Sequence, residues 1–154
     1  FLSGRGYTVL DGALVMVAQA PRFATSGRID VDVSRDLPAG LAGLTGSPER
    51  LAESVRTQLD QRIIFGRLEG ELVASCNLTI DGAWMGISNL RTSAAHRRQG
   101  VGSAVMHHLV RVGNELGAQT FWLQVSPAND PAIAMYQGAG FTVEHRYSYL
   151  GLTP

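Results

Sequence analysis

The sequence predicts a mixed α/β (α+β) domain with a mostly antiparallel sheet flanked by helices. Its length of 154 residues is that of one ordinary domain, and 45% hydrophobic against 17% charged residues provides material for a core. Three strand-like segments, at 62–68, 71–80 and 83–92, are joined by the turn pairs Glu69-Gly70 and Asp81-Gly82. Such pairs between apolar runs indicate an antiparallel meander. Helices and strands alternate after it.

The segments before the meander predict one strand and a helical region. Residues 28–33 alternate apolar with polar side chains, which is the pattern of a half-buried strand. Residues 37–45 are small and glycine-rich and suit a short helix or a loop. Ser47 and Pro48 then provide an N-cap and a first-turn proline, so a helix is expected there. Its apolar stripe has four-residue spacing: Leu51, Val55 and Leu59.

The segments after the meander predict a helix, a strand, a second helix and a strand. The first helix starts within 97–102 and is ended by Gly117. Its apolar side chains share one face: Val101, Val105, Leu109, Val112 and Leu116. A buried strand at 120–125 follows, and the chain is expected to end on a strand at 142–150.

The second helix lies between those two strands. Asn129 or Asp130 is its expected cap, and Pro131 lies in its first turn. Gly138 and Gly140 are expected to stop it.

The first nine residues are similar to a later part of the same chain. Residues 1–9 (FLSGRGYTV) align with residues 135–143 (MYQGAGFTV), and both indicate a helix end, a glycine cap and an aromatic residue that opens a strand. Any helix–glycine–strand junction has this pattern, so a chance likeness is the alternative. We favour a repeat, in which residues 1–20 are the tail of a preceding copy and residues 21–154 are the domain itself. An exposed sheet edge is expected near 13–18, where a second copy of the chain could pair.

Composition excludes several classes of function. Thirteen basic and thirteen acidic residues cancel, so no overall field attracts nucleic acid or an anionic membrane. All basic residues are Arg, which excludes Schiff-base and P-loop lysines. The longest apolar run, at 13–18, is too short for a bilayer and lacks the features of a signal peptide. Cys76 is the single cysteine and is expected to be a buried apolar residue in a cytoplasmic protein.

A glycine-containing segment between a strand and a helix suggests an anion site. It consists of Arg97, Arg98, Gln99, Gly100, Val101, Gly102 and Ser103. A helix N-terminus there offers unpaired N–H groups and the positive end of the helix dipole. Gly100 and Gly102 would let the backbone approach phosphate oxygens closely. The segment lacks the Gly-Lys-Ser/Thr of a P-loop and the third glycine of a dinucleotide site. The plain alternative is a glycine-rich helix start with surface arginines.

A second motif makes the first more specific. It reads Asn129-x-x-Ala132-Ile133-x-x-Tyr136-x-x-x-Gly140-Phe141. Together with Arg97-x-x-Gly100-x-Gly102, it resembles the GCN5-related N-acetyltransferase (GNAT) superfamily over about residues 28–150. The order of elements derived above agrees with the fold that this resemblance implies.

The resemblance implies a site for acetyl-CoA as co-substrate, without a metal. Leu90, Arg91 and Thr92 would pair through their backbone with the pantetheine arm. The backbone amides of Arg98–Ser103 would hold the pyrophosphate, with Arg97 at the mouth of the site, and Asn129 would hydrogen-bond the arm. Tyr136 takes the place of the general acid that protonates the departing thiolate, a transfer between groups of comparable basicity. The alternative for Tyr136 is a tyrosine that only packs on its helix.

The sequence provides no clear general base. Relatives similar to ribosomal-protein acetyltransferases carry a glutamate five residues before the asparagine, where this chain has Gln124. Four other side chains could position a water or titrate: Ser88, Asn89, His96 and Ser126. We expect a water chain, or an amine that is partly deprotonated on binding.

The resulting prediction is an N-acetyltransferase that transfers an acetyl group to the primary amine of a small molecule or peptide by direct attack. An alternative is a non-catalytic CoA-binding or CoA-sensing module of a tandem-domain protein. The presumed first copy has Leu2 at the place of Tyr136. A preceding GNAT-like domain or a homodimer is the expected protein partner. A longer acyl-CoA is a third option. His107 and His108 are expected to pack rather than bind a metal. Trp84 and Trp122 are core residues or a wall of the substrate site.

Overall fold

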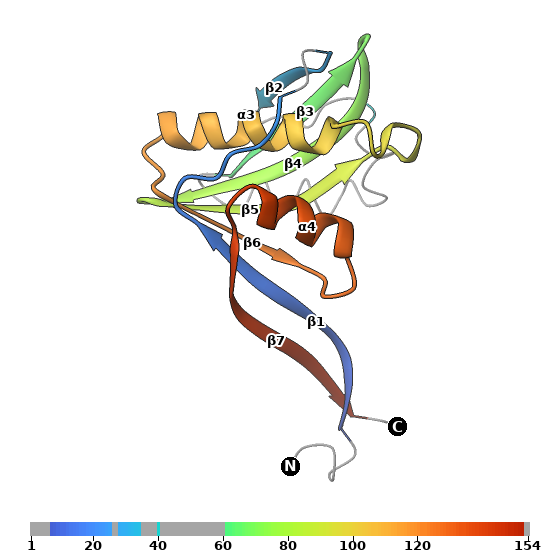
Figure 1. Cartoon of the computed structure of the whole chain (residues 1–154), viewed down its shortest axis with the longest axis vertical. Helices are drawn as coiled ribbons and strands as arrows, with labels where there is room; N and C mark the ends of the chain where they lie inside the picture. Colours follow the sequence, from blue (N-terminus) through green and yellow to red (C-terminus); the bar gives the residue numbers. More distant parts are fainter. Residues whose placement is uncertain (1–6, 26–27, 35–39, 41–60, 153–154) are drawn as a thin grey trace.

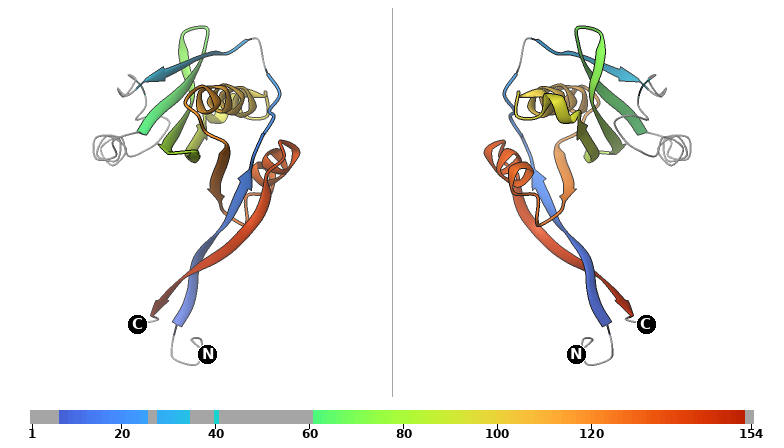
Figure 2. Two further views of the ribbon diagram at one scale, coloured as in Figure 1. Left: turned by 90° about the vertical axis from the view of Figure 1, so that its left-hand side faces the viewer. Right: turned by 90° about the vertical axis from the view of Figure 1, so that its right-hand side faces the viewer.

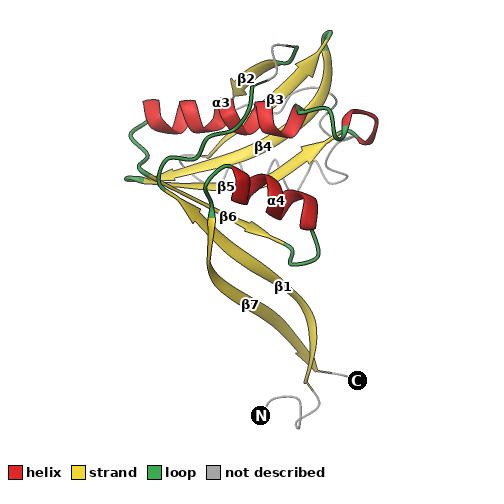
Figure 3. Ribbon diagram, in the orientation of Figure 1, coloured by secondary structure: helices red, strands yellow, loops and turns green. Residues whose placement is uncertain are grey.

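The computed structural model describes residues 7–25, 28–34, 40 and 61–152. In this part of the chain, seven strands form one sheet in the order β2-β3-β4-β5-β6-β1-β7, and helices α3 and α4 lie on the same side of it (Figures 1, 2 and 3). The strands are β1 (Tyr7–Ala18), β2 (Asp30–Ser34), β3 (Gln61–Leu68), β4 (Glu71–Asp81), β5 (Trp84–Thr92), β6 (Thr120–Val125) and β7 (Thr142–Leu152). The helices are α3 (Val101–Glu115), α4 (Asp130–Gly138) and the one-turn η2 (Ala94–His96). The predicted fold class is therefore confirmed.

The meander predicted at the centre of the chain is present. Strand β4 pairs antiparallel with both β3 and β5. Glu69 and Gly70 connect β3 to β4, and both have positive φ angles, 51° and 86°. Two consecutive positive φ angles define the turn whose twist matches that of the flanking strands. Of the described strand pairs, β5–β6 alone is parallel, and a helical crossover through α3 connects those two strands.

Strand β1 corrects the prediction of an exposed sheet edge near 13–18. Residues Leu14–Ala18 pair with β6, while the other edge of β1 pairs with β7 along nearly its whole length. This segment carries apolar side chains toward both faces, and Ala13, Met16 and Ala18 are buried, which suits an interior strand rather than an edge. The assignment of residues 1–20 to the tail of a preceding copy stays a prediction.

The hydrophobic core lies between the sheet and the two helices. The apolar stripe of α3 is confirmed for Val101, Val105, Leu109 and Val112, which are all buried. Leu116 is an exception, because the helix ends at Glu115 and the Leu116 side chain is exposed. Helix and sheet are in close contact at Gly113, where an added Cβ would collide with Met85 and Phe121.

The remaining predicted elements agree with the structure or fall outside its described part. β2 begins two residues later than expected, and β7 runs two residues further, to Leu152. The predicted helix or loop at 37–45, except Gly40, and the helix that starts at Ser47 lie outside the described residues. None of the helices in the described part of the chain is long and apolar enough to cross a membrane.

Candidate active site

The sheet opens between β5 and β6. In the described structure these strands pair only from Trp84 with Thr120 to Ile87 with Leu123. Beyond those residues they diverge, and α4 lies beside the opening (Figure 1). The second half of β5, Ser88–Thr92, therefore has an edge whose backbone groups are not used by β6. Such groups can pair with an extended ligand, as an added strand would.

A bulge marks the start of this free edge. Asn77 of β4 lies opposite Ser88, and Ser75 lies opposite Arg91, so β5 has one extra residue over this interval. Asn89 lies in the bulge with a φ of 55°, an uncommon angle for a residue other than glycine. Bulges redirect a strand and are frequent beside active sites. Here the bulge lies directly after Ile87, the last residue of β5 that pairs with β6.

The N-terminus of α3 has the features that favour an anion. Its N-cap, Gly100, has a φ of 78°, makes no side-chain capping bond, and is followed by no acidic residue in the first turn. Ala104 is the first residue whose N–H reaches back to the Gly100 carbonyl, at 3.0 Å. The N–H groups of Val101, Gly102 and Ser103 therefore have no hydrogen-bond acceptor within the helix, and they lie at the positive end of the helix dipole. Arg97 and Arg98 are exposed just before them.

Gly102 shows how closely three elements meet at this point. A Cβ added there would lie 3.7 Å from Thr92 Oγ1, 3.8 Å from Leu90 Cδ2 and 4.0 Å from Met135 Sδ. The free edge of β5, the first turn of α3 and the middle of α4 are therefore neighbours. At Gly100 an added Cβ would meet nothing within 4 Å, so the backbone of this turn is open to the surroundings.

Asn129 and Tyr136 belong to the two ends of α4. Asn129 is the N-cap, and its Oδ1 accepts a hydrogen bond from the Ala132 N–H at 3.3 Å. The side chain is exposed, and this cap leaves its amide hydrogens available to a ligand. Tyr136, two turns later, packs its ring against Phe141 at 5.9 Å between centroids.

Tyr136 points into the protein. Only 6% of its surface is exposed, and burial, with a smaller contribution from the nearby Cys76 thiol, raises the pKa of its hydroxyl above the ordinary 10.0. Cys76 is itself fully buried on β4, and burial raises the pKa of its thiol to about 12. The thiol is thus an inert neighbour, as predicted, and the phenol holds its proton firmly.

The opposite face of the sheet carries polar and aromatic side chains. Along β6, Phe121, Leu123 and Val125 are buried, whereas the intervening Trp122 and Gln124 are exposed. Because Phe121 lies under α3, Trp122 and Gln124 lie on the face of the sheet that points away from α3. Trp84 and Trp122 are 52% and 36% exposed, so neither is a core residue.

Two polar residues on this face were not found from the sequence. The hydroxyl of Tyr147 on β7 donates a hydrogen bond to Gln124 Oε1 at 2.9 Å. Asn77 on β4 is buried, and in the described structure its Nδ2 has no hydrogen-bond partner. The positions of these two side chains relative to the site depend on the pairing of strands that are far apart in sequence. The sequence has no local signal for that pairing.

Comparison with known proteins identifies the family. A profile described as "Acetyltransferase (GNAT) family" matches residues 38–141, which is more than half of the chain. The chain belongs to the GNAT acetyltransferase family. The profile spans both sequence motifs and the open edge of β5.

Individual relatives match the GNAT chain over shorter stretches. The [Ribosomal protein bS18]-alanine N-acetyltransferase of Escherichia coli K12 is 36% identical over 62 residues, which covers 38% of this chain and 42% of that relative. The PanD regulatory factor of Escherichia coli K12 is 27% identical over 99 residues, or 63% and 76% of the two chains. A solved GCN5-related N-acetyltransferase from Kribbella flavida matches 99% of this chain and 62% of its own, with a TM-score of 0.72 and 20% identity.

The structure brings part of the predicted cofactor site together. The candidates for positioning a water lie in several different places. Leu90, Thr92 and Gly102 are direct neighbours. His96 forms a hydrogen bond of 3.2 Å with Ser93 Oγ, and Ser126 Oγ accepts from the Ala128 N–H at 3.3 Å. Ser88 and Asn89 lie at the bulge.

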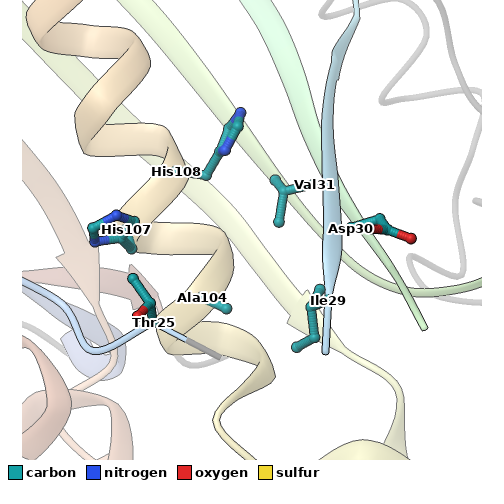
Figure 4. A pocket seen from close by; sticks show the side chains of 7 residues that line it. All are labelled: Thr25, Ile29, Asp30, Val31, Ala104, His107 and His108. Atoms are coloured by element: carbon teal, nitrogen blue, oxygen red, sulfur yellow. The ribbon is translucent and has the colours of Figure 1, made fainter. Parts of the chain in front are cut away.

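His107 and His108 line a separate depression of about 240 Å³ between β2 and α3 (Figure 4). None of the predicted site residues lines it. His107 Nδ1 is 3.2 Å from the Phe23 carbonyl oxygen, and burial together with Arg111 lowers the pKa of His108. Among the described residues, no three His, Cys, Asp or Glu side chains are grouped as metal ligands.

Proposed function

We propose that this GNAT domain is an acetyl-CoA-dependent N-acetyltransferase that acts on a primary amine. One observation carries the proposal: an uncapped helix N-terminus, at Gly100–Ser103, lies against the free edge of β5. Acetyl-CoA combines a pyrophosphate with an extended, amide-containing arm. The first group needs N–H donors and positive charge, and the second needs an unpaired strand edge.

The residues present fit such a molecule. The N–H groups of Val101, Gly102 and Ser103 would hold the pyrophosphate, with Arg97, Arg98 and Gln99 at its rim. The space beside Gly100 is open, and Gly102 leaves room for close approach. The backbone of Leu90, Arg91 and Thr92 would pair with the arm, and the amide of Asn129 would donate to it. The bound thioester supplies the acetyl group.

Tyr136 is the proposed general acid. The amine attacks the thioester carbonyl, the carbon–sulfur bond breaks, and the phenol O–H gives its proton to the departing thiolate. Burial raises the pKa of the phenol, so the group is fully protonated before the step, and the same shift makes it a weaker acid toward the thiolate. The amine nitrogen loses one proton as the amide forms, and that proton restores the phenol O–H, directly or through water.

The amine is proposed to arrive from the face that carries Trp122 and Gln124. The helices α3 and α4 cover the other face (Figure 2), so the two substrates would approach the opening between β5 and β6 from opposite sides. Gln124 cannot accept a proton, and Tyr147 donates to its oxygen. Asn77, whose buried Nδ2 has no hydrogen-bond partner among the described residues, would hold a water near Ser88. This supports a water chain or a partly deprotonated amine in place of a carboxylate base.

The acceptor class stays broad in this proposal. The net charge of the chain is zero, so no overall field attracts a basic polymer. The described acceptor face carries aromatic rather than acidic side chains. Both observations support a small amine or a peptide N-terminus as the acceptor. The bS18-alanine relative is named for a protein N-terminus, which makes a peptide beginning with alanine a reasonable first substrate. We propose a cytoplasmic location, consistent with one buried free cysteine.

A turnover assay tests the proposal. Acetyl-CoA is mixed with a panel of small amines and short peptides, thiol release is followed, and acetylated products are identified by mass spectrometry. We expect amine-dependent thiol release with stoichiometric N-acetylation. Thiol release without acetylated amine would contradict amine transfer.

A regulatory module is the second candidate. The relative named PanD regulatory factor favours it, because that name describes regulation of another protein. Such a module would bind CoA or acetyl-CoA at the same α3 site, yet no amine would accelerate thiol release. Binding together with absence of turnover over the whole amine panel would decide for this candidate.

A further inference from the structure

The β1–β7 ribbon extends beyond the rest of the sheet. Within β1, only Leu14–Ala18 pairs with β6. The preceding part of β1 and the end of β7 therefore form a two-stranded ribbon (Figures 1 and 2). Val9 lies opposite Leu150, and their side chains are 67% and 41% exposed; Tyr149 is 56% exposed. Two strands alone are marginally stable in water, and exposed apolar side chains of this size indicate an interaction site.

The ribbon is built from the two similar segments of the sequence. The alignment of residues 1–9 with 135–143 matches Tyr7, which opens β1, with Phe141, which immediately precedes β7. Continued along both strands, the same offset matches Ala13 with Tyr147, and these two residues are direct partners in the ribbon. A local two-fold axis through this pair therefore exchanges β1 with β7.

The axis relates an edge of β1 that is paired with β6 to an edge of β7 that is unpaired in the described structure. It carries Leu14–Ala18, whose outer edge is paired with β6, onto Ser148–Leu152 of β7. β7 is the last strand of the described sheet, so that its outer edge at Ser148–Leu152 has no strand partner in the described structure. Unpaired edges of this kind accept another strand.

We propose that Ser148–Leu152 pairs with a strand of a second GNAT domain in the same polypeptide, the copy to which residues 1–9 belong. That strand would be the counterpart of β6 and would run antiparallel to β7. One sheet would then continue through the ribbon into both domains, and Val9, Tyr149 and Leu150 would be covered. The proposal rests on the repeat and the strand register and is independent of catalysis.

Hydrogen exchange tests the pairing. The natural polypeptide that contains this sequence is compared with the 154-residue chain, and amide exchange is followed by mass spectrometry in the peptide 148–152. We expect exchange at least about tenfold slower in the natural polypeptide, because ladder hydrogen bonds and burial are added there. Equal exchange rates in the two proteins would overturn the proposal, as would a natural polypeptide with a single GNAT domain.

Two variants of the natural polypeptide make the test specific. Leu150→Lys introduces a charge within the proposed interface and is expected to restore fast exchange at 148–152. Val143→Lys is the control, since Val143 is 45% exposed on the same strand but lies outside the proposed pairing; protection should persist. Equal protection in both variants would overturn the proposal. A doubled mass of the 154-residue chain, with protection of 148–152 on dimerisation, would assign the edge to a second copy of this chain and overturn it too.

Discussion

At the scale of single residues, Tyr136 is the side chain on which the proposed chemistry depends. The place of Tyr136 on α4 followed from local sequence, because the asparagine cap fixes the start of the helix, and Gly138 and Gly140 mark its end. Its burial against Phe141 and its nearness to Cys76 did not follow, since Cys76 lies on a strand sixty residues earlier. Spacing predicts faces and caps, whereas the environment of a side chain depends on tertiary packing.

Replacing Tyr136 separates catalysis from binding. Tyr136→Phe removes the hydroxyl and keeps the buried ring, so kcat should fall by about 10²-fold or more, the usual contribution of a general acid, while the Kd for acetyl-CoA stays within about twofold. Steady-state kinetics and calorimetry measure the two effects. Tyr149→Phe, on the exposed ribbon, is the matched control. Unchanged turnover in Tyr136→Phe would remove this residue from the mechanism.

The pH profile tests the protonation state of the same hydroxyl. Burial raises its pKa above 10.0, so the phenol keeps its proton through the range in which an amine substrate loses one. Activity should rise with pH and show no decline up to about pH 10 for the stable enzyme. A descending limb below pH 9 that disappears in the Tyr136→Phe residual activity would show that the pKa is not raised.

At the scale of elements, the site is formed where α3, α4 and the free edge of β5 meet. The glycine-rich start of α3 and the meander were predicted from sequence, because turns and caps are local signals. The bulge at Asn89 and the hydrogen bond between Tyr147 and Gln124 were not. Both result from pairing between strands, and a shift of one residue in register reverses which side chains share a face.

Two glycines of α3 are expected to differ in how far replacement by alanine lowers the stability of the fold. At Gly102 an added Cβ makes only ordinary contacts, at 3.7 Å or more, so Gly102→Ala should leave the free energy of unfolding within about 0.5 kcal/mol. At Gly113 the Cβ would collide with Met85 and Phe121, so Gly113→Ala should cost about 1–3 kcal/mol. Chemical denaturation measures both. A loss above about 2 kcal/mol in Gly102→Ala would contradict the described contacts.

At the scale of the whole molecule, β1 is the element that sequence reasoning misplaced. Strands that follow one another in sequence are usually neighbours, yet β1 lies between β6 and β7, which are more than a hundred residues later. Nothing local to 13–18 specifies these partners. Once the strand is placed, its apolar side chains on both faces are explained.

The integration of β1 can be measured by core truncation. Met16 is fully buried between the sheet and the helices, so Met16→Ala should destabilise the domain by about 2–5 kcal/mol. Val9→Ala, at an exposed position of the same strand, should change stability by less than about 0.5 kcal/mol. Equal, small effects would mean that β1 is not part of the cooperative fold.

The central claim, that the start of α3 and the edge of β5 form a site for acetyl-CoA, is tested most directly by calorimetric titration of the wild-type chain and of Gly102→Ala with acetyl-CoA. We predict micromolar binding to the wild type. In Gly102→Ala the added methyl group occupies the space needed for close approach, so binding should weaken by tenfold or more, about 1.4 kcal/mol, at unchanged stability. Equal affinity in the two folded proteins would place the site elsewhere, and absence of binding to the folded wild type would contradict the account.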